Sequence, residues 1–78
     1  MMGTFITFIE AGRSVSGKTL RWRICTKDNG AELGQIRWYP QWRKYVFYPY
    51  HATLYEWVCL REIAAFCEAR TNAHKAAP

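Results

Sequence analysis

One segment of the sequence, residues 19–26, alternates strictly between two sets of side chains. The two alternating sets are Leu20, Trp22 and Ile24 on one side, and Arg21, Arg23 and Cys25 on the other. A period of two is typical of a β-strand that buries one face and leaves the other accessible. The segment therefore predicts a sheet with one apolar face and one face that carries arginines.

Three further segments have the composition of strands, at residues 4–9, 33–39 and 42–48. Turn residues separate them: Asp28-Asn29-Gly30 tolerates positive φ, and Pro40 suits the second position of a tight turn. Short connections between consecutive strands favour antiparallel neighbours. We expect an antiparallel β-meander of three to four strands.

The chain changes character towards its C-terminus. Thr53 and Glu56 have the spacing of a capping box, in which both side chains satisfy free amides at a helix start. No Gly or Pro interrupts residues 54–70, and apolar residues gather on one stripe at 100° per residue. The stripe comprises Cys59, Leu60, Ile63, Phe66 and Cys67. We expect one C-terminal helix packed on one face of the sheet, followed by a flexible tail over residues 71–78.

The length of 78 residues suits one small domain, which we place at residues 1–70 in an α+β fold. No run reaches the ~18 continuous apolar residues of a membrane helix, and no basic start precedes the first apolar run. Three cysteines are an odd number for a disulfide framework, so we expect buried, reduced thiols. These features predict a cytoplasmic protein with no membrane partner.

One helix covers only one face of a sheet, so the other face is left for solvent or a partner. The register of the last strand depends on its turn, because one step flips every side chain. A two-residue turn pairs Tyr39 with Trp42 and puts Tyr45 and Phe47 in the core, whereas a three-residue turn exchanges the two sets. We prefer the two-residue turn. The predicted partner-binding residues are Arg21, Arg23, Arg37, Tyr39, Trp42, Lys44 and Tyr48.

The charge is concentrated in the segments expected to form the sheet. The chain has a formal net charge of +5, and residues 13–44 hold eight basic and two acidic residues, a net +6. Cations interleaved with aromatic rings suit nucleic acid, since guanidinium groups pair with phosphates and rings stack on bases. Trp, Tyr and Arg are also enriched in protein interfaces, so a protein surface or a homodimer through the same face is the alternative.

Two short motifs suggest other functions, and neither has the expected context. Residues 12–19 match the phosphate-binding pattern G-x-x-x-x-G-K-[ST], which needs a helix at the Gly-Lys-Thr, whereas residues 19–26 alternate as a strand. We expect instead a basic hairpin loop within reach of a phosphate.

Trp42-Arg43-Lys44-Tyr45 spells the tetrapeptide of plant WRKY domains without their zinc ligands, two cysteines followed by His-x-His. His51 and His74 have no neighbouring acid and nucleophile, and we expect both to be solvated. The chain is predicted to be no enzyme and to use no metal or cofactor.

Three segments together resemble a set of small uncharacterised phage and prophage proteins: Leu33–Tyr39, Trp42–Pro49 and Cys59–Phe66. The shared pattern is a Trp-Tyr strand, a Trp-Arg-x-Tyr-x-Phe strand and a Cys-Leu-x-x-Ile helix. The resemblance implies a mobile-element protein that acts in the bacterial host cell, and it assigns no activity to any residue. Our expectation is a non-enzymatic protein that binds nucleic acid or a nucleoprotein complex. The alternative is a phage inhibitor of a host defence protein, similar to an anti-CRISPR.

Overall fold

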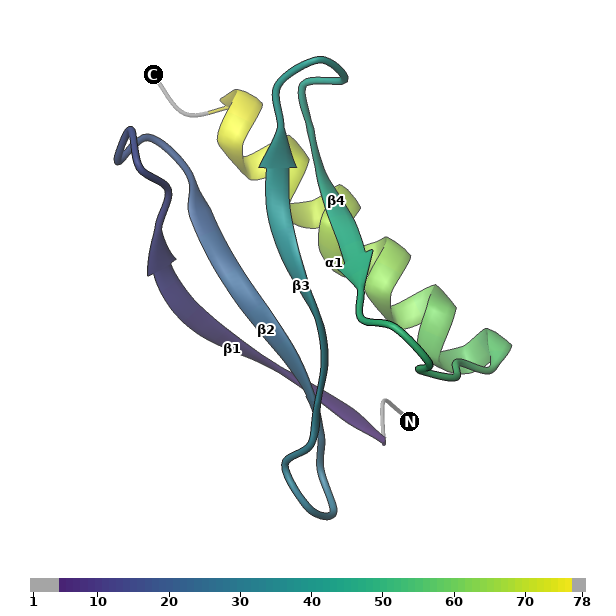
Figure 1. Cartoon of the computed structure of the whole chain (residues 1–78). Helices are drawn as coiled ribbons and strands as arrows, with labels where there is room; N and C mark the ends of the chain where they lie inside the picture. Colours follow the sequence, from purple (N-terminus) through teal and green to yellow (C-terminus); the bar gives the residue numbers. More distant parts are fainter. Residues whose placement is uncertain (1–4, 77–78) are drawn as a thin grey trace.

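The computed structural model describes residues 5–76 as a four-stranded antiparallel sheet with one C-terminal helix (Figure 1). The elements are β1 (Ile6–Arg13), β2 (Leu20–Thr26), β3 (Glu32–Tyr39), β4 (Lys44–Pro49) and α1 (Trp57–Ala76). The strands lie in the order β1-β2-β3-β4, and the helix crosses one face of the sheet. The expected α+β meander is confirmed.

The alternating pattern of the second strand places its apolar side chains in the core. Trp22 and Ile24 are buried under the helix, and so is Ile36 from β3. The helix supplies Ile63 to the same cluster, and the ring of Phe66 meets that of Trp22 edge to face, with 5.1 Å between centroids. Burial of these aliphatic and aromatic groups is the main source of stability in so small a chain.

The first strand extends beyond its expected end at residue 9 and continues to Arg13. Glu10 pairs with Trp22, and a bulge then shifts the register before Gly12, which has φ of 104°. Glycine adopts this conformation without the steric penalty of a side chain. The bulge lets the strand continue into the β1–β2 hairpin. Residue 4 of the predicted strand lies outside the described residues.

The turn between β3 and β4 is longer than predicted. The expected pairing of Tyr39 with Trp42 is wrong, because Tyr39 pairs with Lys44 and the turn holds four residues instead of two. A shift of two residues keeps every side chain on its face of the sheet. The prediction that Tyr45 and Phe47 face the core is therefore confirmed, since Tyr45 is buried and Phe47 packs against the core.

The helix begins three residues later than predicted, at Trp57, and it has no capping box. The Glu56 carboxylate alone accepts hydrogen bonds from the amides of Val58 (2.8 Å) and Cys59 (3.1 Å). Bonding to the Val58 amide is the main reason why the pKa of Glu56 lies below its usual value. Thr53 instead donates its hydroxyl to the carbonyl of Tyr50. The acid thus satisfies the orphan amides from the N-cap position itself.

The helix also continues past its predicted end at residue 70, because residues 71–76 of the predicted tail belong to it. The Thr71 hydroxyl is buried and accepts a hydrogen bond from the Tyr45 amide at 2.9 Å, at the free edge of β4. His74 is half-buried, with its ring centroid 4.5 Å from that of Trp38, and is not the solvated residue expected. Tertiary contacts extend the helix where the sequence shows no periodicity. Residues 77–78 lie outside the described residues.

On the helix itself, one member of the predicted stripe faces solvent. Cys59 and Ile63 are buried and Phe66 and Cys67 pack against the core, whereas 48% of Leu60 is exposed. The three cysteines are free thiols, as expected.

Candidate nucleic-acid interface

The helix leaves one face of the sheet uncovered, which we call the open face (Figure 1). The strand pairings place the following side chains on it: Thr7, Ile9, Arg21, Arg23, Cys25, Gln35, Arg37, Tyr39, Lys44, Val46 and Tyr48. Accessibility varies across this face, since Cys25 is buried and Arg37 is exposed. Six of the seven sequence-predicted residues lie on the open face, and Trp42 is the exception.

Trp42 lies in the β3–β4 turn, at the end of the open face. Its ring meets that of Tyr39 edge to face, with 4.7 Å between centroids, and 65% of the residue is exposed. Arg43 follows with φ of 54°, the left-handed conformation that closes this four-residue turn. The turn therefore presents an indole to solvent beside a tyrosine of the sheet, which is an apolar surface suited to stacking.

The guanidinium of Arg37 lies over the ring of Tyr48, 4.4 Å from its centroid. These residues come from the adjacent strands β3 and β4, where Arg37 pairs with Val46 and Gln35 pairs with Tyr48. A guanidinium stacked on a ring loses side-chain freedom while its N–H groups stay directed outwards in the plane. Arg37 is thus an exposed and oriented donor group on the open face.

Arg21 lies beside Arg37 on the neighbouring strand and is partly buried. The two arginines line a shallow cavity of about 180 Å³, which the β1–β2 loop closes with Ser14 and Val15. Nε of Arg21 is buried there without a hydrogen-bond partner among the described residues. A buried donor without an acceptor costs free energy in the folded protein.

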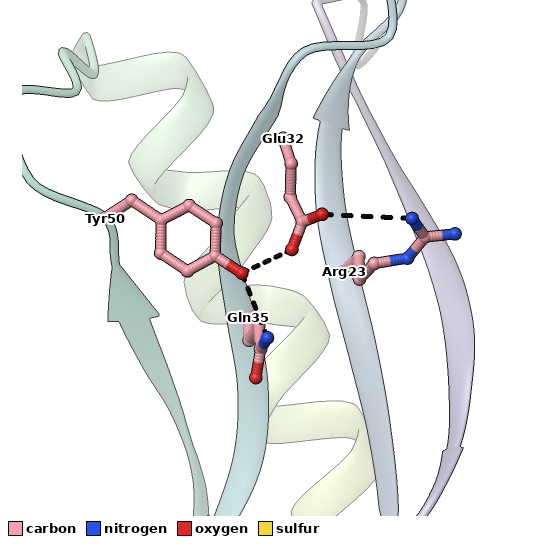
Figure 2. Close-up of polar contacts among 4 residues, drawn as sticks. All are labelled: Arg23, Glu32, Gln35 and Tyr50. Carbon is pink, nitrogen blue, oxygen red and sulfur yellow. Dashed lines mark hydrogen bonds and ion pairs between the residues drawn. The ribbon is translucent and has the colours of Figure 1, made fainter.

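Arg23 differs from Arg21, Arg37 and Lys44 because it has an acidic partner (Figure 2). Its guanidinium lies 3.8 Å from a carboxylate oxygen of Glu32. Tyr50 donates its hydroxyl to the same carboxylate and accepts a hydrogen bond from the Gln35 amide at 2.9 Å. The bond to Glu32 is the main reason why the pKa of Tyr50 is raised. Arg23 is therefore partly neutralised within the protein.

Sequence reasoning missed Glu32 and Tyr50. Both lie just outside the predicted strands, and they meet because the Tyr50 amide extends the β3–β4 pairing by donating to the carbonyl of Leu33 at 2.9 Å. No local pattern in the sequence indicates this long-range contact.

The remaining positive charges of the open face are uncompensated. Arg21, Arg37 and Lys44 form no ion pair with any other described residue. Within residues 5–76, Glu32 is the one acid that forms an ion pair with a cation of this face, and its carboxylate is bound by both Arg23 and Tyr50. The face therefore has a local excess of positive charge with hydrogen-bond donors, which attracts polyanions.

The segment with the G-x-x-x-x-G-K-[ST] pattern forms the β1–β2 hairpin turn. The Gly17 amide donates to the Ser14 carbonyl at 2.9 Å, and β2 begins at Leu20. No helix follows the Lys18-Thr19 pair, so the amides do not converge as they do in nucleotide-binding loops.

Within residues 5–76, no cluster of three metal-ligating side chains occurs, and α1 lacks the apolar length needed to cross a bilayer.

Fold and site together define a small α+β meander protein with a basic, aromatic open face. Comparison with protein-family models, with curated proteins and with solved structures found no significant match.

Proposed function

We propose that this protein binds nucleic acid through its open face and catalyses no reaction. The observation that carries the proposal is the pair Arg21 and Arg37, which line one cavity and have no acidic partner among the described residues. A phosphate oxygen placed there would accept hydrogen bonds from the outer N–H groups of both guanidinium groups. Lys44, two strand positions from Val46, would contact a further phosphate.

Single-stranded nucleic acid fits this face better than a duplex. The exposed ring of Trp42 and the half-buried ring of Tyr39 lie next to Lys44, so an unpaired base could stack where its phosphate is neutralised. Base stacking on aromatic side chains contributes about 1–3 kcal/mol per base. A duplex hides its bases from such rings, and its backbone alone would meet the cations.

The predicted residues have different roles in the proposed binding. Arg21, Arg37 and Lys44 would hold phosphates, and Tyr39 and Trp42 would stack. Tyr48 would act by supporting the guanidinium of Arg37. Arg23 would contribute less, because Glu32 already holds it. The resemblance to phage proteins supports a role for such binding in the host cell during infection, as part of the same proposal.

The test is fluorescence anisotropy with labelled single-stranded DNA and RNA at low salt. Arg37→Glu is the informative variant, and Arg61→Glu is its matched control. Both arginines are exposed and stacked on a ring, with 5.2 Å from the Arg61 guanidinium to the Trp57 ring, but Arg61 lies on the helix. Circular dichroism checks that both variants are folded.

We expect Arg37→Glu to weaken binding by about tenfold or more, because it removes one phosphate contact and adds a repulsive charge. Arg61→Glu should change the affinity by less than about threefold, since its charge is distant and screened. An equal loss of affinity for the oligonucleotide in Arg37→Glu and Arg61→Glu would reject the open face as a nucleic-acid site. Absence of binding by the wild type would reject it as well. Capture of a protein by the wild type and not by Arg37→Glu would favour the protein-inhibitor alternative.

A further inference from the structure

A second cavity lies on the helix side of the sheet, at the end where the β1–β2 hairpin approaches the last turns of α1. Its volume is about 220 Å³. The residues that give it chemical character are Arg13, Lys18, Trp22, Tyr45, Arg70 and His74. It is separate from the open face, because Arg13 pairs with Leu20 and both side chains lie on the helix side.

The basic groups of this cavity come from two different parts of the chain. Arg13 and Lys18 belong to the β1–β2 hairpin, whereas Arg70 and His74 are four residues apart and share one face of the helix. A basic side chain in the last turn of a helix offsets the helix dipole, which gives a reason for the position of His74 and not for that of Arg70. The hairpin pair has no such reason to lie in the same cavity.

Two of these side chains are held in place. The guanidinium of Arg70 lies over the rings of Trp22 and Phe66, at 4.9 and 5.1 Å from their centroids. Nη1 of Arg13 donates to the Gly17 carbonyl at 3.2 Å, which ties that arginine to its own hairpin. Their remaining N–H groups are free to bind a ligand with little loss of entropy on binding.

Neutral and charged donors surround this space, and no carboxylate lines it. Arg13, Lys18 and Arg70 form no ion pair with any described residue. The Tyr45 hydroxyl accepts a hydrogen bond from the Leu20 amide at 3.3 Å, so the hydrogen of this hydroxyl is available to be donated to a ligand. Cations held together without a counter-charge repel one another, and a bound anion would remove that repulsion.

We propose that this cavity binds the phosphate group of a phosphomonoester. Arginine and lysine donors suit the oxygens of a dianion, and the aromatic floor would contact the sugar or other group attached to the phosphate. The volume is below the ~300–1,000 Å³ of pockets that enclose whole drug-sized ligands, so a phosphate with its nearest atoms is the part that fits. A free mononucleotide and the 5′-phosphate of a strand are two sources of the same chemistry.

The experiment is a titration of the isotope-labelled protein with inorganic phosphate and with adenosine 5′-monophosphate, monitored by NMR. The indole N–H of Trp22 and the amides of residues 70–74 report on this cavity. Lys18→Gln removes one donor from an exposed hairpin position, and Arg61→Gln is the matched loss of charge elsewhere on the surface. Adenosine without a phosphate is the control ligand.

We expect saturable shifts at Trp22 and residues 70–74 with both phosphates and none with adenosine. Lys18→Gln should raise Kd by about tenfold, and Arg61→Gln and Arg37→Glu should leave it unchanged. Shifts that do not saturate, or an equal Kd in Lys18→Gln and Arg61→Gln, would overturn the proposal. Since Arg37→Glu tests the open face alone, the two sites can fail independently.

A second arm identifies the source of the phosphate. Oligonucleotides with and without a 5′-phosphate are compared in the Arg37→Glu background, where binding to the open face is weakened equally for both strands. Tighter binding of the phosphorylated strand would assign the cavity to strand ends. Equal binding of both strands, together with saturable binding of the mononucleotide, would assign it to a free ligand.

Discussion

At the residue scale, the hydroxyl of Thr71 joins the helix to the edge of the sheet. Tyr45 is buried, and its amide points away from β3 at the outer edge of β4, where no further strand can accept it. The Thr71 hydroxyl supplies that acceptor at 2.9 Å. A single side chain thus satisfies a buried backbone donor and fixes the last turns of α1 on the sheet.

Replacing Thr71 by valine should lower the free energy of unfolding by about 1–3 kcal/mol. Valine has nearly the same shape, so the loss comes from a buried amide without an acceptor. Urea unfolding followed by circular dichroism measures it. Thr71→Ser keeps the hydroxyl and serves as the control, and equal stability of the two variants would contradict this role.

The Cys67 thiol should react slowly in the folded protein. Burial raises its pKa to about 11, so its thiolate fraction at neutral pH is about a hundredfold below that of an ordinary cysteine. Alkylation by iodoacetamide, followed at this site by peptide mass spectrometry, should accelerate as the pH approaches 11. A rate at neutral pH equal to that of the unfolded chain would disprove the assignment.

The same shift has a consequence for stability. The thiol loses its proton more easily in the unfolded chain than in the folded one. The contribution of the Cys67 thiol to the free energy of unfolding is therefore fully present below the usual thiol pKa. It is lost as the pH rises through about 11, which is the pKa of this thiol in the folded protein.

At the scale of elements, the meander requires one close approach between neighbouring strands. Gly34 of β3 is buried opposite Pro49, and a Cβ atom there would lie 2.5 Å from the Tyr48 carbonyl oxygen and 2.8 Å from a ring carbon of Phe47. Real Cβ atoms essentially never come so close to backbone. Glycine at this position lets β4 pair closely with β3 while Phe47 reaches the core.

Gly34→Ala should therefore lower the free energy of unfolding by about 1–3 kcal/mol, the usual cost of overpacking. A thermal melt measures the effect. Gln41→Ala, at an exposed turn position, provides a control that should change the melting temperature little. An unchanged melting temperature in Gly34→Ala would show that the two strands can separate at this point without cost.

The elements were predictable where a local pattern determines them. The alternation around Trp22 predicts which side of β2 faces the core, and the same parity places Arg21 on the open face. The length of the β3–β4 turn was not predictable, because Pro40 suits turns of several lengths. The extension of α1 past Arg70 was not either, since it depends on the contact between Thr71 and a strand 26 residues away.

At the scale of the whole molecule, the β1–β2 and β3–β4 hairpin turns lie at one end of the sheet, beside the last turns of α1 (Figure 1). Lys18 lies in one of these turns and Arg43 in the other. The opposite end holds Lys27 together with Asp28 in the β2–β3 turn, and Glu56 at the start of the helix. This uneven distribution orients an approaching polyanion towards the end that carries both proposed sites.

The candidate site was predictable to the level of faces and not of contacts. The alternation of side chains along each strand was enough to place six of its seven residues on the open face. The pairing of Arg23 with Glu32 and the stacking of Arg37 on Tyr48 depend on strand register. Those contacts decide which cations are available to a ligand. They reduce the expected phosphate contacts from four to three: Arg21, Arg37 and Lys44.

The most direct test of the open face is the salt dependence of binding to a single-stranded oligonucleotide. Three phosphate contacts predict a slope of about −2 in a plot of log Kobs against log salt, at about −0.7 per contact. Arg37→Gln should reduce the magnitude of that slope by about 0.7, because one counterion-releasing contact is lost. A slope near zero, or the same slope in wild type and Arg37→Gln, would contradict the account.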